Sequence, residues 1–499
     1  MRFSSFHLPV MILSALCTLC MACEPGPVDM DISFGPAEPF PQSERAILGG
    51  MPPKQVGFIL YDLDRALVIR AHNRDVGFIP ASTSKVPTAI AALEVLGPGH
   101  RYETILAYRG SISGGTLKGD LWLRGTGEPL LGTGDLMGMI DAIEKKGIRR
   151  IDGHFFFDES DLTRLEQIDE GMDRDVSYNA GLSALSFDYN SIVAEWKRDR
   201  KSDTTEIYLI PTLPMNRAGI FSEKLRENVT FAYREDGGIE SWLLSPEEKT
   251  SGSDRLPVKR PGLYTAQLFA KLCAMRRISL PAPVPGTMPG SARTLTVHEG
   301  ARLIDILDTT LTYSINLSSE LILLSTAKKI SGKALTLEES ARAMGEYLSG
   351  RMRSVHWEGL RLANGSGLTT MSRISPEQML AFLVYADTRD YGGKRFRYLL
   401  PASGWTWSLA RRLGRPETAF RVWAKTGTIN FAQGLAGYLH TSTGRSMAFV
   451  VFVNDMDTRR RYDADPDRRN KEWSRRVAAW HNGARSVMDG LVATWIREL

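Results

Sequence analysis

The chain has 499 residues, of which 43% are hydrophobic and 24% are charged. This length exceeds one typical hydrophobic core and predicts two or three domains, while the composition excludes both a disordered chain and a membrane-spanning bundle. A net charge of +5 is small for the length, so the sequence is not that of a dedicated nucleic-acid-binding protein.

The N-terminus is typical of an exported protein. Met1 and Arg2 precede an apolar stretch that is too short to span a bilayer, so residues 1–22 are predicted to be a signal peptide. Residues 23–50 are rich in proline and show little periodic pattern, so we expect them to form an extended tether.

The four cysteines predict no disulfide framework, because only Cys273 lies clearly in the mature chain, where we expect it to be buried. The stretch from Cys20 to Cys23 is similar to a lipoprotein cleavage box, although Cys20 stands where leucine is usual. A lipid anchor at Cys23 is therefore an open alternative to simple release after export.

Two strand-like runs, 57–62 and 66–70, predict a hairpin that leads into Ser82-Thr83-Ser84-Lys85. Apolar residues at helical spacing follow and predict a helix that ends at Gly97. Positions i and i+3 share one face of a helix, so Ser82 and Lys85 are expected to touch. Pro87 lacks an N–H group and moves the expected helix start to Ser84, with Ser82 just before it.

Short strand-like runs separated by turn residues fill residues 104–258, with one helix near 135–146. This change of pattern predicts a mainly β inserted region that forms two small domains. Residues 51–103 and 259–499 are then the two parts of one split domain.

The second part of the split domain begins with helices, predicted at 263–277, 301–312 and 319–330. A short break at 313–318 separates the last two, and Ser318 or Ser319 is the expected N-cap of the later helix. Strands return near 420–425, 435–439 and 447–453, and a long amphipathic helix is predicted from Lys471 to Leu499. Arginines between Arg459 and Arg476 alternate with aspartates, which favours a solvated surface over an anion site.

Three short motifs occur in a meaningful order. Ser82-x-x-Lys85 stands at a helix start, Ser314-Ile315-Asn316 at a break between helices, and Lys425-Thr426-Gly427 on a strand. Each motif alone is weak, because Ser-x-x-Lys recurs at Ser325 and Ser-x-Asn recurs at Ser177. The ordered set is the arrangement of penicillin-interacting serine enzymes.

These residue types suit nucleophilic catalysis. A serine hydroxyl needs a base, and only about one free lysine in 2,500 is neutral at pH 7. Burial and a neighbouring cation can lower that pKa, so Lys85 is the candidate base and Lys425 the neighbouring cation. Ser314 is a candidate proton relay to the leaving amine, and the amides of Ser82 and Thr428 are a candidate oxyanion hole. No metal or cofactor is expected, since the chain has no His-Glu-x-x-His motif and no Cys/His cluster.

With these motifs in hand, the chain resembles the D-alanyl-D-alanine carboxypeptidase/endopeptidase family of penicillin-binding proteins. The resemblance also rests on Leu123 to Pro129, Gly365 to Leu368, Leu400 to Gly404 and Leu435 to Tyr438. Asn364 and Glu128 stand where the family usually has aspartate. The resemblance implies an α+β fold, with a penicillin-binding or serine β-lactamase-like transpeptidase domain that contains an antiparallel sheet, flanking helices and a helical subdomain, and with a large, mainly β insertion.

The resemblance further implies a periplasmic serine enzyme that acts on peptidoglycan stem peptides and cross-links through acylation of Ser82. Asn316 would hold the substrate backbone, Thr426, Gly427 and Thr428 would line the substrate, and β-lactams would act as covalent inhibitors. Two alternatives stay open: a β-lactamase or esterase with the same serine chemistry, and a wall-binding or β-lactam-sensing protein without turnover.

Overall fold

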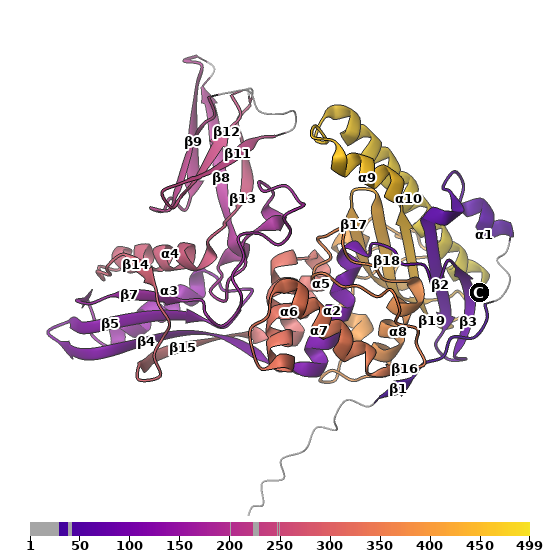
Figure 1. Cartoon of the computed structure of the whole chain (residues 1–499), viewed down its shortest axis with the longest axis horizontal. Helices are drawn as coiled ribbons and strands as arrows, with labels where there is room; N and C mark the ends of the chain where they lie inside the picture. The colour runs from indigo at the N-terminus through magenta and orange to yellow at the C-terminus, as the bar shows by residue number, and fades with distance from the viewer. Residues whose placement is uncertain (1–28, 38–41, 200, 223–228, 247, 249) are drawn as a thin grey trace, which may run out of the picture.

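The structure is a computed structural model that describes residues 29–37, 42–199, 201–222, 229–246, 248 and 250–499. Helices and strands are combined in two bodies that lie side by side in Figure 1. The body on the right contains both ends of the described chain, and the body on the left is the inserted region. The mixed α+β architecture predicted from the sequence is confirmed.

An antiparallel sheet of five strands forms the centre of the split domain, in the order β17-β18-β19-β2-β3. The N-terminal hairpin therefore pairs with the three C-terminal strands, as Ile59 opposite Val450 illustrates. The helix α10, Lys471–Glu498, packs on one face of this sheet. The strands are β2 Val56–Asp62, β3 Leu67–His72, β17 Val422–Ile429, β18 Ala432–His440 and β19 Ser446–Asn454.

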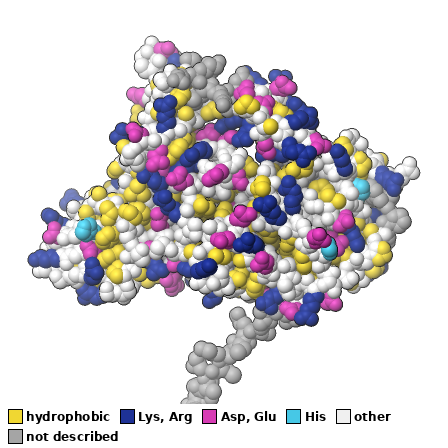
Figure 2. All heavy atoms as spheres, in the orientation of Figure 1, with side chains coloured by type: hydrophobic (Ala, Val, Ile, Leu, Met, Phe, Trp, Pro, Cys, Tyr) yellow, Lys and Arg dark blue, Asp and Glu magenta, His cyan; other side chains and the backbone are white. Residues whose placement is uncertain are grey.

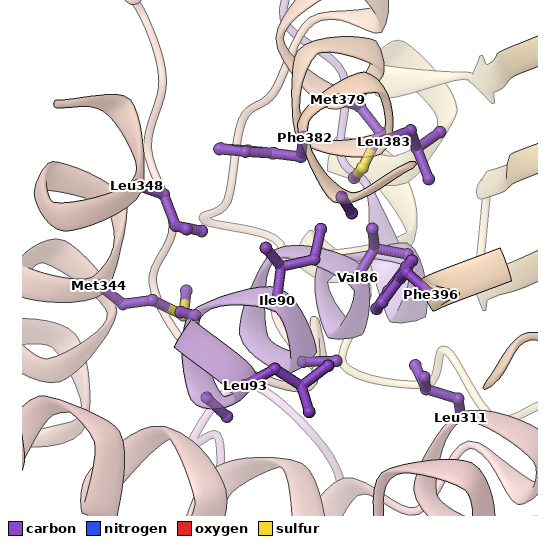
Figure 3. Close-up of a cluster of buried hydrophobic side chains, with 14 of the residues drawn as sticks. Val86, Ile90, Leu93, Leu311, Met344, Leu348, Met379, Phe382, Leu383 and Phe396 are labelled. Carbon is purple, nitrogen blue, oxygen red and sulfur yellow. The ribbon is translucent and has the colours of Figure 1, made fainter. Parts of the chain in front are cut away.

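The other face of the sheet is covered by a helical subdomain built around α2, Lys85–Val95. Figure 3 shows Val86, Ile90 and Leu93 of this helix pointing toward side chains of the helices around it. Because α2 is buried on nearly all sides, its apolar residues hold it rigidly at the centre of the domain. The surrounding helices are α5 Leu303–Tyr313, α6 Asn316–Ser331, α7 Leu337–Ser349 and α8 Pro376–Asp387.

The inserted region contains a larger sheet, in the order β14-β7-β5-β4-β15 with β6 beside β5, and two three-stranded sheets. The larger sheet packs against α3, Thr133–Lys145, and α4, Pro261–Met275. Its strands are β4 Arg101–Ser113, β5 Thr116–Gly125, β6 Arg150–Ile151, β7 Phe155–Asp158, β14 Pro283–Pro285 and β15 Arg293–Arg302. The smaller sheets contain β8 Ser191–Asp199, β9 Thr204–Ile210, β10 Asn216–Ile220, β11 Phe231–Asp236, β12 Ile239–Leu244 and β13 Gly252–Pro257.

The boundaries of the inserted region differ from the expected 104–258. The sheet begins with β4 at Arg101 and ends with β15 at Arg302, and α4 belongs to its buried core. Residues 259–302 therefore pack with the insertion and not with the split domain. Helical periodicity in α4 suggested continuity with the later helices, but its apolar face packs on the larger sheet.

The segment 23–50 was expected to be an extended tether, but those of its residues that the structure describes are docked on the split domain. The strand β1, Met30–Asp31, pairs in parallel with β16, Met352–Arg353, and Ile32 is buried beside it. The helix α1, Gln42–Ile47, lies against α10 (Figure 1). The predicted signal peptide 1–22 and Cys23 lie outside the described residues.

The surface is mixed in charge, with basic and acidic side chains interspersed over the face in Figure 2. Cys273 is buried and is a free cysteine, as predicted. Within the described part of the chain, no helix is both long and apolar enough to cross a membrane.

Candidate active site

Ser82 and Lys85 meet across a single tight turn. A 3-10 turn, η2, covers Ala81–Ser84, and α2 begins at Lys85. Side chains at i and i+3 eclipse one another in a 3-10 turn, and Ser82 Oγ lies 3.0 Å from Lys85 Nζ. Pro87 falls in the first turn of α2, where its missing N–H has no helical partner, so it causes no break. The contact predicted between Ser82 and Lys85 is confirmed.

The Lys85 amine is enclosed by oxygen atoms and is 1% exposed. Besides Ser82, it donates to Asn316 Oδ1 at 2.8 Å and to the Ser366 carbonyl at 2.8 Å. Those two oxygens only accept hydrogen bonds, whereas a serine hydroxyl can also donate. A neutral Lys85 amine can therefore give its two hydrogens to Asn316 and Ser366 and offer its lone pair to the Ser82 proton.

The electrostatic environment of Lys85 favours this neutral form. Burial, and next the positive charge of Lys425, hold the pKa of Lys85 well below its ordinary value, while the nearby Glu320 carboxylate opposes the decrease. Lys425 is also fully buried, and burial lowers its pKa to about 7. Burial thus lowers the pKa of both lysines, and the positive charge of Lys425 lowers that of Lys85 further.

Ser314 and Asn316 come from the junction of α5 and α6. Ser314 is the C-cap of α5 in the left-handed conformation, with φ of 58°, and Asn316 is the first residue of α6. The sequence placed the start of α6 near Ser319, but Ile315 is its N-cap, and Ser319 is buried and donates to the Gly365 carbonyl at 2.9 Å. The earlier start fixes Asn316 on a helix, where Oδ1 faces Lys85.

The strand β17 forms the third wall of the site. A Cβ atom on Gly427 would lie 2.5 Å from the Pro80 carbonyl and 3.0 Å from the Ser82 amide, so only glycine lets the strand approach the nucleophile turn. Lys425 Nζ donates to the Thr426 carbonyl at 2.9 Å. Thr428, one residue beyond Gly427, is exposed in the cleft. The Ser82 amide therefore lies at the contact between η2 and Gly427, the residue before Thr428 on β17.

The three walls enclose a cleft of about 300 Å³. Of the predicted residues, Ser82, Ser314, Asn316 and Thr428 line the cleft directly. Lys85, Lys425 and Gly427 are buried behind this lining, and Thr426 is half-buried on β17.

The sequence analysis did not predict the wall that closes the outer end of the cleft. It consists of Met172, Asp173 and Tyr178 from the inserted region together with Arg459 and Arg468. Arg468 pairs with Asp173 at 2.9 Å, and Asn316 Nδ2 donates to the Tyr178 carbonyl at 3.1 Å. Arg459 is only 4% exposed, so the expectation of a solvated surface is wrong at this residue. The alternation of arginine and aspartate along the sequence gave no sign that Arg468 forms an ion pair with Asp173 of the inserted region.

Glu320 is a second residue that the sequence analysis missed. Its buried carboxylate accepts from the Gly365 and Ser366 amides, each at 2.8 Å. The Ser366 peptide thereby joins Glu320 to Lys85, because its carbonyl accepts from the Lys85 amine. Glu320 lies four residues after Asn316 on α6, and this spacing on one helix face is the signal that could have revealed it.

The additional motif copies have structural roles. Ser325 donates to the Leu321 carbonyl at 2.8 Å within α6, and Lys328 pairs with Asp161 at 2.8 Å. Ser177 belongs to a 3-10 turn, η3 Ser177–Asn179, in the inserted region. Among the described residues, no group of histidine, cysteine, aspartate or glutamate side chains is arranged to hold a metal ion.

Comparison with known families now identifies the chain. The D-Ala-D-Ala carboxypeptidase 3 (S13) family matches residues 46–471. The chain belongs to this S13 family. It is therefore a serine-type D-Ala-D-Ala carboxypeptidase, a DD-peptidase of peptidoglycan.

Two relatives of this S13 peptidase are similar over most of their length. The D-alanyl-D-alanine carboxypeptidase DacB of Haemophilus influenzae is 24% identical, over 81% of this chain and 86% of the relative. A D-alanyl-D-alanine carboxypeptidase of Actinomadura sp. strain R39 is 26% identical, over 79% of this chain and 76% of the relative.

The fold of the S13 peptidase is also found in a solved structure. The crystal structure of penicillin binding protein 4 from Haemophilus influenzae matches with a TM-score of 0.75 and 22% identity, over 90% of this chain and 99% of that chain. A second structure of that protein, in complex with a β-lactam, matches with a TM-score of 0.73 and 22% identity, over 91% of this chain and all of that one. The penicillin-binding fold expected from the motifs is confirmed.

Proposed function

We propose that this S13 peptidase is exported and cleaves peptidoglycan stem peptides through an acyl-enzyme on Ser82, releasing terminal D-alanine and opening D-alanyl cross-links. The observation that carries the proposal is the Ser82–Lys85 contact of 3.0 Å, made to an amine whose pKa burial and Lys425 lower. A serine beside a neutral buried amine is an activated nucleophile.

In the acylation step, Ser82 Oγ attacks the carbonyl carbon of the penultimate D-alanine, and its proton passes to Lys85 Nζ. The negative charge that develops on the carbonyl oxygen is stabilised by the amides of Ser82 and Thr428. The peptide C–N bond then breaks, and the leaving amine takes up a proton that Ser314 relays from Lys85. Asn316 orients the substrate backbone, and Thr426 and Thr428 contact the carboxylate end.

In the deacylation step, a water molecule attacks the ester carbonyl. Its proton passes to Lys85, and Ser82 Oγ leaves with a proton, which restores the free enzyme. A β-lactam enters the same first step, because its strained amide is opened by Ser82 Oγ. Its ring nitrogen remains tethered to the acyl group and hinders the attack of water, so the β-lactam acts as a covalent inhibitor.

The location proposed is the periplasm, with a lipid anchor at Cys23 as the alternative to release. Residues 1–22 support export by their charged start and apolar stretch. Mass spectrometry of the N-terminal peptide from the mature protein distinguishes a cleaved, lipidated Cys23 from an unmodified end.

The decisive experiment incubates the wild type and Ser82→Ala with free pentapeptides and with cross-linked muropeptides. We expect the wild type to release D-alanine and monomers, and Ser82→Ala to release neither. Intact-protein mass spectrometry after exposure to penicillin should show one adduct on the wild type and none on the variant. A wild type that leaves both substrates unchanged contradicts the proposal.

A further inference from the structure

Four large aromatic side chains are exposed at the end of α5, next to Ser314 of the cleft, and on the loop that precedes β17. They are Tyr313, Trp405, Trp407 and Phe420, which are 54%, 72%, 65% and 59% exposed. We call these four residues the aromatic surface. They form two ring pairs, with Trp407 at 5.3 Å from Tyr313 and Trp405 at 6.1 Å from Phe420. A single exposed aromatic residue is ordinary, whereas two exposed ring pairs that share one loop are typical of an interaction site.

The loop of residues 400–421, which precedes β17, carries three of these rings and is anchored by buried residues. Leu409 and Ser403 are fully buried, and Ser403 Oγ donates to the Thr418 carbonyl at 2.9 Å. The Phe420 amide donates to the Ser403 carbonyl at 3.0 Å. One side of the loop is therefore packed into the protein through Ser403 and Leu409, and the aromatic rings are exposed to solvent. Rings held outward by an ordered loop lose little freedom when they bind a ligand.

The backbone gives a second, independent indication of function. Trp407 and Phe420 both have positive φ, 33° and 58°, which is rare for bulky side chains. Such strain persists where the surrounding structure imposes it, and it concentrates at binding sites. Here it occurs at two of the residues that present rings to solvent.

The aromatic surface adjoins the cleft through Tyr313. Tyr313 directly precedes Ser314, which lines the cleft, and Trp407 contacts the Tyr313 ring. The start of the loop also borders β17, because Ala402 bridges to Trp423, two residues before Lys425. The cleft volume lies toward the other end of β17, at Thr428 and Asn430. A substrate larger than the stem peptide that leaves the cleft at the Ser314 side passes over this surface.

The charged residues of the same loop do not belong to the aromatic surface. Arg411, Arg415 and Glu417 line a separate hollow against α10. Stem peptides carry carboxylates, whereas the glycan strand offers flat sugar faces whose C–H groups stack on aromatic rings. Trp has in addition an N–H group for the polar edge of a sugar. Exposed rings next to a peptidoglycan site, without added charge, therefore match the glycan polymer better than a charged stem peptide.

We propose that the aromatic surface binds the N-acetylhexosamine glycan strand that carries the stem peptide being cut, so that the enzyme prefers polymeric peptidoglycan to free peptides. This inference rests on the proposed function. It adds a binding site of defined ligand class, a neutral aminosugar polymer, to the catalytic cleft.

The test compares D-alanine release from insoluble peptidoglycan with release from free pentapeptide, for the wild type and for a Trp405→Ala/Trp407→Ala double variant. We expect the ratio of polymer rate to peptide rate to fall about tenfold, as for the loss of stacking anchors. The matched control is Tyr208→Ala, an exposed aromatic on β9 of the inserted region, for which both rates should remain as in the wild type. An unchanged ratio in the double variant overturns the inference.

A second measurement uses the wild type alone and so does not depend on how the variant folds. Glycan strands freed of stem peptides should inhibit hydrolysis of insoluble peptidoglycan and leave pentapeptide hydrolysis unaffected. If the glycan strands do not inhibit, the inference is overturned. It is also overturned if the wild type binds phosphatidylglycerol vesicles, the double variant does not, and the ratio of polymer rate to peptide rate is the same in both. A wild type inactive on both substrates instead refutes the proposed function.

Discussion

At the residue scale, the chemistry depends on whether the Lys85 amine can offer a lone pair. Two of its three neighbours, Asn316 Oδ1 and the Ser366 carbonyl, accept its hydrogens and so direct the remaining lone pair to Ser82. We expect Lys85→Arg to lower the rate of acylation by at least about 10²-fold, because a guanidinium keeps its charge and cannot act as a base. The rate of labelling by a fluorescent penicillin measures this effect.

The dependence of acylation on pH should report the charge around Lys85. The reaction needs neutral Lys85, so activity is lost as the pH falls through the lowered pKa of this residue. Lys425 contributes to that decrease by its positive charge, and Lys425→Gln removes it. We therefore expect the acid limb of the pH–rate profile in Lys425→Gln to move to higher pH, whatever the change in maximal rate. A limb that moves to lower pH would contradict this assignment.

Glu320 should act in the opposite direction and also through position. Its charge raises the pKa of Lys85, so Glu320→Gln should shift the acid limb to lower pH. The side-chain amide of Gln also places an NH₂ group opposite one of the two backbone N–H groups of Gly365 and Ser366, so one hydrogen bond is lost. Because the Ser366 carbonyl accepts from Lys85, this loss should lower the acylation rate about tenfold.

The control for Glu320 is Glu240→Gln. Glu240 is likewise buried and accepts from two backbone amides, those of Lys259 and Arg260, but it lies in the inserted region. Loss of a similar interaction there should lower the melting temperature without moving the pH profile. If both variants leave the profile in place, Glu320 has only a structural role.

Sequence reasoning at this scale found the residues that belong to motifs. The helix-start spacing of Ser82 and Lys85 was sufficient to predict their contact, and the structure shows it. Glu320 and the Ser366 carbonyl were missed because their role arises from a backbone segment brought in from elsewhere in the chain. A carbonyl group leaves no trace in the sequence, since every residue has one.

At the scale of elements, the site depends on how closely β17 approaches η2. Gly427 has no room for a Cβ atom, with the Pro80 carbonyl and the Ser82 amide in the way. We expect Gly427→Ala to push the strand from the nucleophile turn and to reduce acylation by at least about 10²-fold through the misplaced oxyanion donors. Crystal structures and penicillin labelling of the variant would measure both effects. Gly134→Ala is the control, because that glycine lies on α3 in open space.

The sequence predicted the existence of most elements and misplaced some of their ends. Hydrophobic periodicity located α2, α10 and the strands of the central sheet. It placed the start of α6 too late, because Ser318 and Ser319 look like N-caps although both are buried inside the helix. The break after Tyr313 instead comes from the left-handed conformation of Ser314, which serine rarely adopts and which no propensity would predict.

At the scale of the whole molecule, the inserted region supplies one wall of the cleft. Ion pairs join it to the C-terminal part: Arg468 pairs with Asp173 at 2.9 Å, and Arg469 pairs with Asp175 at 2.8 Å and with Asp173 at 3.8 Å. Partly exposed pairs contribute about 1 kcal/mol or less each, so Asp173→Asn/Asp175→Asn should change the melting temperature little. We expect a several-fold lower kcat/KM for pentapeptide, because the wall at Tyr178 and Asn316 is no longer held.

The control for this double variant is Asp141→Asn. Asp141 pairs with Arg276 at 3.2 Å inside the inserted region and has no contact with the cleft wall. Its loss should leave kcat/KM unchanged. Equal kcat/KM in the wild type and in Asp173→Asn/Asp175→Asn would show that the wall keeps its place without these pairs.

The overall division into a split domain and a mainly β insertion could be read from the change of pattern along the chain. The end of the insertion could not, because residues 259–302 look like the start of the helical part and yet pack on the larger sheet of the insertion. The ion pairs between the two bodies could not be predicted from the sequence either, because they join charged residues that are far apart in the chain.

The paired ends of the insertion have a consequence for the order of folding. Arg101 lies opposite Arg302 where β4 and β15 meet, so the inserted region brings its own two ends together when it folds. The central sheet must join β2 to β19 across most of the chain, a contact of very high sequence separation. Prior folding of the insertion shortens the effective loop, which lowers the entropic cost by on the order of 0.6 kcal/mol per halving of loop length. During synthesis the insertion is complete before β17 to β19 emerge, so we expect it to fold first and the catalytic walls to assemble last.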